Sequence, residues 1–538
     1  MIDQPEFRRY LVSIDSVSTP QLFTECLVIG AGIAGLRAAI EAAEQCDVIV
    51  VCKGTIQDSN TWMAQGGIAS VLKEPDSFES HIADTLSTGC GISDEEIVKM
   101  VVRQGPQLIE QLLRWGTDFD LIDGHIAATL EGGHTHARIA HAHGDETGRI
   151  IAEALIRKAR QNPNIKIIEN FYVIDLLSNG DNGCIGIIGY DKRGPQIIWS
   201  AGTILASGGA GQLYRETTNP DVATGDGIAM AYRAGAVLQD LEFMQFHPTT
   251  LYVAGASRAL VTEALRGEGA ILRDNKGRAF MKSYHESAEL APRDIVSRAI
   301  LEQMLKTKST HVYLDVRHFD KEHFTKRFPT ISELCESFGI DVSRDLIPVR
   351  PSAHYMIGGV KTDAEAATNI KNLYACGEAA VTGLHGANRL GSNSLLEGLV
   401  FGKIAGQSTC RRIKKTDAAG IKHRRIKHQI PHSNRTLLNT SDVRNSLRAL
   451  MWRNVGIIRK AQLLMETQEI VRFWQRYVMD KTFEQPQDWE CQNMLTVALL
   501  MAQAAQMRKE SRGVHYRSDF PETDDEHFKR HIEITAGK

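Results

Sequence analysis

The clearest pattern of apolar and polar positions in this 538-residue chain lies near its N-terminus. A short apolar run at 26–29 predicts a buried strand, a glycine-rich loop occupies 30–35, and an alanine-rich stretch at 36–45 predicts a helix. Another apolar run at 48–51 predicts a second buried strand. Strand, glycine loop, helix and strand in this order are typical of the right-handed βαβ unit of a dinucleotide-binding fold.

This α/β rhythm continues to about residue 240. Amphipathic patterns at 94–115 and 147–160 predict helices, and the runs at 166–177 and 202–207 predict strands. The rhythm is lost over 241–352, which holds the densest set of His, Arg and Thr motifs. That block therefore predicts a separate unit inserted into the α/β domain.

The rhythm returns after the inserted block. Residues 372–378 predict a strand with a turn, and 394–407 predict a helix. Beyond about residue 430, the stretches 444–479 and 489–507 carry apolar residues at helical spacing and predict a small helical bundle.

These changes of pattern give the predicted fold class, which is α/β plus α. We expect a Rossmann-like nucleotide-binding domain in two chain segments, an α+β capping domain and a C-terminal helical bundle. The predicted boundaries are an N-terminal lead at 1–24, the nucleotide-binding domain at 25–240 and 353–425, the cap at 241–352 and the helical domain at 426–538.

Composition narrows the class of protein. The length exceeds one compact core and predicts two or three domains, and the formal net charge of -3 gives no sign of a nucleic-acid partner. Nine scattered cysteines without a Cys-x-x-Cys pair argue against a disulfide framework or a zinc site, so we expect no metal. With neither a signal peptide nor an apolar run of membrane-spanning length in the sequence, we expect a cytoplasmic protein without membrane contact.

The glycine loop matches the pattern G-x-G-x-x-G in the context that supports a dinucleotide site. Gly30 allows the tight turn, Gly32 lets the backbone approach a pyrophosphate, and Gly35 lets the helix pack against the strand. The free N–H groups at the start of the helix would face the phosphates. A tight turn without a ligand remains the alternative, and the position between a strand and a helix favours the site.

The end of the second strand departs from the usual pattern. Many such sites carry Asp or Glu there to bind the ribose hydroxyls, whereas this chain carries Lys53. Lys53 can donate hydrogen bonds to ribose or phosphate oxygens, but a plain NAD site fits less well.

Three further segments favour FAD. The loop from Asn60 to Gly67 is polar and ends in glycines, as a loop that lines an isoalloxazine ring would. Asp226 follows Thr224 and Gly225 and can bring a carboxylate to the cofactor, and Glu378 follows a late strand directly. Any one of them could be a surface turn; together with the βαβ unit they favour a two-segment FAD domain.

The inserted block and its flanks carry the side chains that a dicarboxylate requires. Five short motifs supply two His, three Arg and two Thr, and they lie at 247–249, 262–269, 292–294, 352–355 and 386–389. Arg presents a planar fork to a carboxylate, while His and Thr add donors. Surface salt bridges are the usual explanation of a single Arg, but not of five clusters that flank a cofactor domain.

On these motifs the chain resembles the flavoprotein superfamily of succinate dehydrogenase and fumarate reductase over residues 25–420. Within it, the segment from Leu130 to His136 is similar to the branch that oxidises L-aspartate, in which its Glu meets the amino group of the substrate. The membrane-complex relatives attach FAD covalently through a His, and Asn60 stands at that position here. The resemblance therefore implies non-covalent FAD.

The resemblance also implies a role for each site residue. Arg293 would shuttle the proton, and Glu131 would orient the amino group. The substrate set would be completed by His247, Thr262, Glu263, His354, Arg389 and Ser392. The FAD contacts would be Gly30, Ala31, Gly32, Ile33, Ala34, Gly35, Lys53, Asn60, Thr61, Trp62, Met63, Ala64, Gln65, Gly66, Gly67, Val173, Asp226, Glu378, Ser394 and Leu395.

The implied reaction is oxidation of L-aspartate to iminoaspartate by hydride transfer from Cα to flavin N5. Reduced flavin would be reoxidised by O2, giving H2O2, or by fumarate. This would be the first step of de novo NAD biosynthesis, and a transient contact with quinolinate synthase would pass on the product. The cap would close over the substrate.

Three alternatives stay open from the residues alone. A soluble fumarate reductase or succinate dehydrogenase subunit would share nearly every motif, and Glu131 and Asn60 speak against it. A non-catalytic flavin-binding subunit would leave the Arg and His motifs without a purpose. An NAD-dependent dehydrogenase would not require the additional flavin segments.

Overall fold

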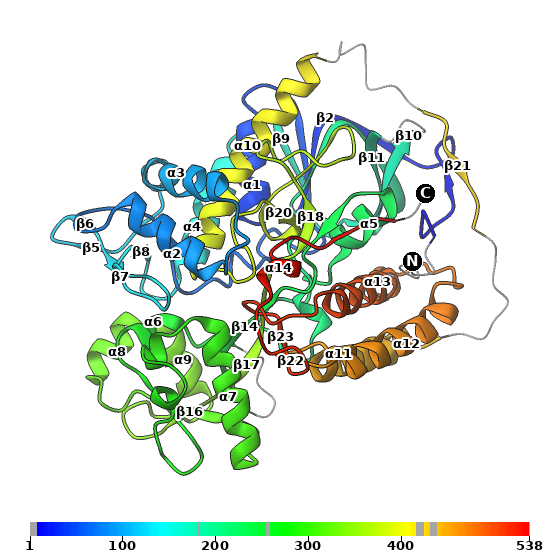
Figure 1. Ribbon diagram of the computed structural model, residues 1–538. Helices are drawn as coiled ribbons and strands as arrows, with labels where there is room; N and C mark the ends of the chain where they lie inside the picture. The colour runs from blue at the N-terminus through cyan, green and yellow to red at the C-terminus, as the bar shows by residue number, and fades with distance from the viewer. Residues whose placement is uncertain (1–7, 180–182, 254–258, 416–423, 431–437, 537–538) are drawn as a thin grey trace.

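The computed structural model describes residues 8–179, 183–253, 259–415, 424–430 and 438–536. Figure 1 shows three bodies: an α/β unit, a second unit drawn in green and a helical bundle drawn in orange to red. The first seven residues of the predicted lead lie outside the described residues. Within the described ranges, no helix combines the length and the apolar character needed to cross a membrane.

A seven-stranded sheet forms the centre of the α/β unit. Its order is β10-β11-β12-β2-β3-β9, and β19 also pairs with β12. The members β2, β3, β9, β19 and the second half of β12 run parallel, so their carboxyl ends meet at one edge. The strands are β2 (Gln21–Ile29), β3 (Val48–Val51), β9 (Ile165–Ile168), β10 (Tyr172–Asn179), β11 (Gly183–Asp191), β12 (Gly194–Leu205) and β19 (Leu373–Ala375).

Helices cover this sheet, and two of them approach each other unusually closely. Gly398, Gly402 and Gly406 lie one turn apart on α10, and a methyl group at Gly402 or Gly406 would lie 2.6 Å from a carbonyl oxygen of α1. Small residues at this spacing let the two backbones pack in contact. The helices of the unit are α1 (Ile33–Ala42), α2 (Phe78–Thr88), α3 (Glu95–Arg114), α4 (Thr147–Arg160), α5 (Asp226–Ala234) and α10 (Asn393–Lys415).

The second unit has its own antiparallel sheet, in the order β14-β17-β16-β15, and its own apolar core. Strand β17 crosses the boundary predicted between residues 352 and 353, so it connects the second unit to the α/β unit. The elements are β14 (Met244–Leu251), α6 (Glu263–Gly267), β15 (Ile271–Arg273), α7 (Arg293–Thr307), β16 (Val312–Asp315), α8 (Lys321–Arg327), α9 (Pro329–Ser337) and β17 (Ile347–Met356).

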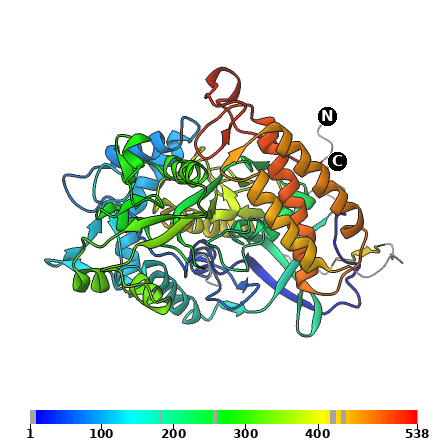
Figure 2. The same cartoon turned by 90° about the horizontal axis from the view of Figure 1, so that it is seen from below.

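The C-terminal bundle consists of α11 (Thr440–Asn454), α12 (Ala461–Val478) and α13 (Pro486–Met507). Figure 2 shows these helices side by side along one edge of the molecule. From Trp489 to Ala505 every residue of α13 is buried, because the helix also packs against α5 and joins the core of the α/β unit. The bundle is therefore an integral part of the molecule.

Small sheets and turns complete the fold. The chain end returns to the α/β unit, where β24 pairs with β13. The short strands are β1 (Ile14–Asp15), β4 (Ile68–Ala69), β5 (Leu121–Ile122), β6 (His125–Ile126), β7 (Ala128–Thr129), β8 (Ile139–Ala140), β13 (Leu238–Gln239), β18 (Gly359–Lys361), β20 (Ala380–Val381), β21 (Lys427–His428), β22 (Ile458–Arg459), β23 (Tyr516–Arg517) and β24 (Glu533–Ile534), and a short helix, α14, spans Asp525–Phe528.

The structure differs from the sequence prediction at two places near the sheet. Strand β2 begins at Gln21, so the last four residues of the predicted lead belong to the sheet. The single strand predicted over 166–177 is two strands, β9 and β10, because the chain turns at Asn170, whose φ is 55°. Asn tolerates this left-handed conformation better than most residues.

Candidate active site

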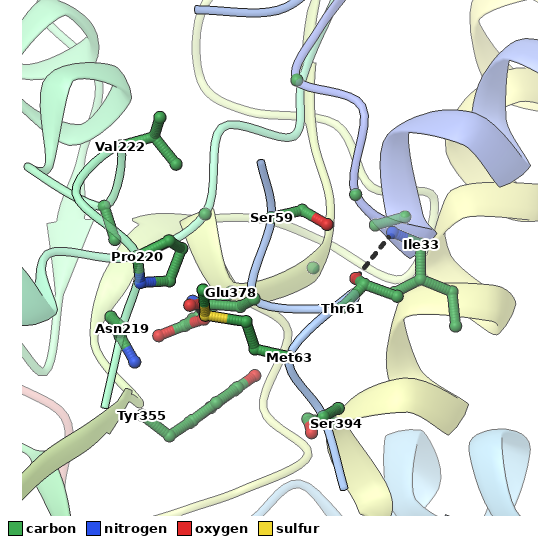
Figure 3. Close-up of a pocket in the computed structure, with 18 of the residues that line it drawn as sticks. Ile33, Ser59, Thr61, Met63, Asn219, Pro220, Val222, Tyr355, Glu378 and Ser394 are labelled. Atoms are coloured by element: carbon green, nitrogen blue, oxygen red, sulfur yellow. Dashed lines mark hydrogen bonds between the residues drawn. The ribbon is translucent and has the colours of Figure 1, made fainter. Parts of the chain in front are cut away.

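A cavity of about 240 Å³ opens at the carboxyl ends of β2, β3 and β12 and continues to the second unit. It is lined by every site residue predicted from the sequence except Gly35 and Trp62. In Figure 3, Ser59, Thr61 and Met63 lie on one side of it, and Asn219, Pro220 and Val222 lie on the other. Open α/β sheets bind ligands at this edge.

The glycine loop forms one wall of the cavity. Gly30 has a φ of 109°, and a methyl group there would lie 2.1 Å from the carbonyl oxygen of Ala206. A methyl group at Gly35 would lie 2.0 Å from the carbonyl oxygen of Gly30, so Gly35 packs behind the loop and does not face the cavity. Helix α1 begins without a side-chain cap, and Thr61 Oγ1 accepts the N–H of Ile33 at 3.0 Å (Figure 3).

The predicted flavin loop runs along the cavity from Asn60 to Gly67. Asn60 Nδ2 donates to Glu378 Oε2 at 2.8 Å, and the N–H of Met356 donates to Glu378 Oε1 at 2.9 Å. Burial raises the pKa of Glu378 to about 7 in spite of these hydrogen bonds. Trp62 packs against the apolar core of the α/β unit and is not among the lining residues of the cavity, so its predicted contact with the cofactor stays a prediction.

Lys53 lies at the end of β3, as predicted, but its ammonium group is fully engaged by the protein. Lys53 Nζ lies 2.7 Å from Thr224 Oγ1, 2.8 Å from Asp226 Oδ2 and 2.5 Å from Glu490 Oε1. An ammonium group has three protons, so none is left for a ribose or phosphate oxygen in this arrangement. Burial alone would lower the pKa of Lys53, but the two carboxylates outweigh it and raise the pKa.

Asp226 lines the cavity beside Lys53. Its Oδ1 accepts from the hydroxyl of Tyr172 at 2.9 Å and from Asn493 Nδ2 at 2.7 Å. Since Asn493 and Glu490 belong to α13, the C-terminal bundle holds Asp226 and Lys53 in this wall of the cavity.

Several buried polar atoms of the cavity lack a protein partner among the described residues. They are Ser207 Oγ, Gln65 Oε1, Asn219 Oδ1 and Glu131 Oε1. Buried polar groups are normally hydrogen-bonded, so these atoms indicate a polar ligand. A methyl group at Gly208, which also lines the cavity, would meet no atom within 4 Å. The open space, the start of α1 beside it and the unpartnered polar atoms fit a dinucleotide such as FAD.

The far end of the cavity brings together the residues predicted to bind a substrate. The two imidazole rings of His247, on β14, and His354, on β17, lie 5.1 Å apart between centroids. Burial and neighbouring guanidinium groups lower the pKa of both well below the usual range, so both rings are neutral near pH 7. His354 Nδ1 lies 2.9 Å from Thr218 Oγ1.

Two guanidinium groups face this end of the cavity. Arg293, the first residue of α7, donates through Nε to Glu263 Oε2 at 2.6 Å, and Arg266 donates to the other carboxylate oxygen at 2.6 Å. Burial alone would raise the pKa of Glu263, but Arg293 and Arg266 lower it to about 2. Arg389 lies over the ring of Tyr355 at 4.4 Å, and burial together with Arg293 lowers its pKa to about 10.

Glu131 lies between the flavin loop and the two guanidinium groups. Its Oε2 accepts the hydroxyl proton of Ser392 at 2.9 Å, and Ser392 is held in the left-handed region with a φ of 62°. Thr262 caps the start of α6 nearby. Burial and the Glu263 carboxylate raise the pKa of Glu131.

Sequence reasoning missed several residues of the site. Tyr355 and Gln245 each stand within two positions of a predicted histidine, and the alternation of strand side chains could have pointed to Gln245 beside His247. Tyr172, Glu490 and Asn493 carry no local signal, because only the docking of α13 brings the last two to Lys53 and Asp226. No group of three or more potential metal ligands occurs among the described residues.

Two known protein families match most of the chain. The FAD binding domain family matches residues 25–395, and the fumarate reductase flavoprotein C-terminal family matches residues 444–538. The sequence is 41% identical to L-aspartate oxidase of Streptomyces coelicolor over 95% of this chain and 91% of that protein. It is 41% identical to the chloroplastic L-aspartate oxidase of Arabidopsis thaliana, over 94% and 82%.

Solved structures agree with this placement. A quinol fumarate reductase flavoprotein of E. coli is similar with a TM-score of 0.89 and 33% identity, covering 96% of this chain and 95% of that chain. The Sdh1 complex of Mycobacterium smegmatis is similar with a TM-score of 0.81 and 31% identity, covering 94% and 90%. The fumarate reductase flavoprotein fold, with an α/β FAD-binding part and a C-terminal helical domain, is therefore the fold of this chain.

Proposed function

The chain belongs to the family of FAD-dependent L-aspartate oxidases, and from this premise we propose that its cavity binds L-aspartate and oxidises it to iminoaspartate. This is the entry reaction of NAD biosynthesis. The observation that carries the proposal for the site is the unpartnered oxygen of the buried Glu131, which faces a cavity holding two guanidinium groups. Arg293 and Arg389 offer donors to the two carboxylates of aspartate, and the free oxygen of Glu131 offers an acceptor to its ammonium group.

We propose that FAD lies along the glycine loop and the loop from Asn60 to Gly67. When bound, FAD supplies the acceptor for the hydride of the substrate and passes the electrons on to O2 or fumarate. The start of α1 would hold the phosphates, and Ser207 and Glu378 offer polar groups to the rest of the cofactor.

The attachment of FAD is proposed to be non-covalent, because Asn60 has no nucleophilic atom and its amide is used by Glu378. Unfolding the protein in acid and filtering it tests this point. The yellow colour should pass through the membrane with the small molecules, and colour retained with the chain would contradict the proposal.

The substrate carboxylates would be held by Arg389, Arg293 and the neutral imidazoles of His247 and His354. Fixing both ends of a four-carbon acid leaves one orientation for its Cα–H bond, and such positioning accounts for a large part of the lowering of a barrier.

The substrate must also release a proton when its Cα gives up a hydride, and we assign the transfer of that proton to Arg293. Its guanidinium contacts Glu263, which contacts Arg266, and Arg266 NH1 donates to the carbonyl oxygen of Glu289 at 2.6 Å. The hydrogen-bonded side chains of Arg293, Glu263 and Arg266 lead away from the cavity toward the backbone of Glu289, and they give a proton a route that avoids the substrate carboxylates.

An anaerobic flavin spectrum tests the proposed function directly. Adding L-aspartate to the purified protein should bleach the flavin absorbance. Succinate tests the alternative, a succinate dehydrogenase or fumarate reductase activity, because it lacks the amino group that Glu131 would bind. Bleaching by succinate and not by aspartate would overturn the assignment.

A further inference from the structure

Gln245 lies on β14, fully buried, two residues before His247. Its Oε1 accepts from Arg293 NH1 and from Arg389 Nε, each at 3.2 Å. Its Nε2 donates to Asn388 Oδ1 at 2.8 Å and to the carbonyl oxygen of Arg389 at 2.7 Å. A side-chain amide has two donor protons and one oxygen with two lone pairs, so every capacity of Gln245 is used.

The two guanidinium groups that meet at Gln245 come from different bodies of the molecule. Arg293 begins α7 in the second unit, whereas Arg389 lies in the loop before α10 of the α/β unit. A second connection closes a ring, since Asn388 Nδ2 donates to Asp294 Oδ1 at 3.0 Å, next to Arg293. The ring fixes the spacing of two cations that would otherwise repel each other.

The carbonyl oxygen of Gln245, which both guanidinium groups share, carries no net charge. Arg293 already pairs with the Glu263 carboxylate at 2.6 Å, and the neutral carbonyl of Gln245 adds no second negative charge beside Arg293 and Arg389. A carboxylate at the same place would pair with them and compete with the carboxylates of the substrate. An apolar side chain would leave the two cations without a common anchor.

We propose that Gln245 is a positioning residue, which holds Arg293 and Arg389 at the spacing of a four-carbon dicarboxylate and leaves their charge available because its carbonyl is neutral. The proposal rests on the proposed function, in which these two residues bind the substrate. It predicts different defects for the loss of neutrality and for the loss of hydrogen bonding.

The test compares Gln245→Glu with Gln245→Met. Gln245→Glu keeps the shape and adds a charge, so KM for L-aspartate and the dissociation constant of succinate should rise about 10- to 100-fold, with a smaller change in kcat. Lowering the pH should restore part of the succinate binding as the new carboxyl group is protonated. Gln245→Met keeps the volume and removes the anchor, so kcat should fall more than KM rises.

Gln161→Glu, an exposed position at the end of α4, is the matched control for the added charge. FAD affinity, measured by flavin fluorescence, should stay unchanged in all three variants. Succinate binding in Gln245→Glu equal to that of the unaltered protein would overturn the proposal. If Gln245→Glu does not retain FAD, the test rests on Gln245→Met. Unaltered kcat and succinate binding in Gln245→Met would then overturn the proposal.

The outcome is separable from that of the proposed function. Failure of the unaltered protein to bleach with L-aspartate would count against the function itself. If L-aspartate bleaches the unaltered protein but Gln245→Glu and Gln245→Met show the same changes in kcat and KM, the result would count against the role of Gln245 alone.

Discussion

At the scale of single residues, the Glu131 carboxylate lies close both to the loop from Asn60 to Gly67 and to Arg293. A methyl group at Gly66, in the flavin loop, would lie 2.9 Å from Glu131 Oε1, and one at Gly391 would lie 3.3 Å from Glu131 Oε2 and 3.2 Å from Arg293 NH2. A ligand that reaches from the guanidinium groups toward the flavin loop must therefore pass this carboxylate. An ammonium group there would gain a partner, and a methylene group would not.

The variant Glu131→Gln isolates this contact, because it removes the charge and keeps the shape. KM for L-aspartate should rise about 10- to 100-fold, as expected for a lost hydrogen bond to a charged group. Succinate binding, followed through the flavin spectrum, should change by no more than a few-fold. Equal weakening of both ligands would show that Glu131 acts on the cavity as a whole.

The pH dependence of binding follows from the same carboxylate. Burial and Glu263 raise the pKa of Glu131, so its charge is lost at a higher pH than that of an ordinary Glu. As the pH falls through that raised pKa, KM for L-aspartate should rise, because the ammonium group loses its partner. Succinate should bind equally well or better over the same range. Measuring KM and the succinate inhibition constant from neutral pH into the acid range checks the direction.

The residues predicted from the sequence are those whose signal is local. Gly30 and Gly35 follow from a spacing that backbone contact enforces, and His247 and Arg389 follow from motifs. Lys53 shows the limit of that reasoning. Its place at the end of β3 could be predicted, but its partners Asp226 and Glu490 stand 173 and 437 positions away along the chain, and only the folded molecule brings them together.

At the scale of elements, α13 is the helix whose role could least be predicted. Its apolar residues predict a helix, but one that is buried on all sides has no polar face to show which way it docks. The structure places its Glu490 between Lys53 and Arg444, with 2.5 Å to the first and 2.8 Å to the second. A helix of the bundle thus supports Lys53, a lining residue of the proposed cofactor site.

Glu490→Gln should therefore weaken FAD binding by about tenfold, since Lys53 would lose one of two carboxylate partners and shift within the wall. The measurement is the dissociation constant of FAD from quenching of its fluorescence. Glu469→Gln, at an exposed position of α12, is the control. With saturating FAD, kcat for L-aspartate should stay close to that of the unaltered protein. Unchanged FAD affinity in Glu490→Gln would mean that this residue of the bundle does not contribute to FAD binding.

At the scale of the whole molecule, buried ion pairs of Arg508 connect the C-terminal segment to the core. Arg508 is fully buried and donates to Glu242 Oε1 at 2.6 Å and to Glu510 Oε1 at 3.0 Å. Its remaining protons reach the carbonyl oxygens of Phe528 and Arg530, close to the strand β24 that pairs with β13. The tail and the start of the second unit therefore share one buried cation.

Replacing that cation should destabilise the fold strongly. Arg508→Met leaves the Glu242 carboxylate buried without its partner, and breaking a buried pair in this way costs about 3–5 kcal/mol. Urea unfolding followed by circular dichroism measures the loss. Arg476→Met, at an exposed position of α12, should change stability by less than about 0.5 kcal/mol. Equal stability of the two variants would mean that the network around Arg508 contributes little.

The bodies that surround the cavity give the last prediction. Thr262, Glu263 and Arg293 come from the second unit, whereas Glu131 and Arg389 come from the α/β unit, so a bound dicarboxylate would connect the two. Such a ligand stabilises the joined arrangement by about 2.7 kcal/mol at a concentration 100 times its dissociation constant. Succinate should therefore slow proteolysis within 241–352, the unit we expect to act as a cap, and acetate at the same ionic strength should not. The protection should be lost in Arg389→Met, which removes the contact on the α/β side. Equal cleavage with and without succinate would mean that the second unit does not close on the ligand.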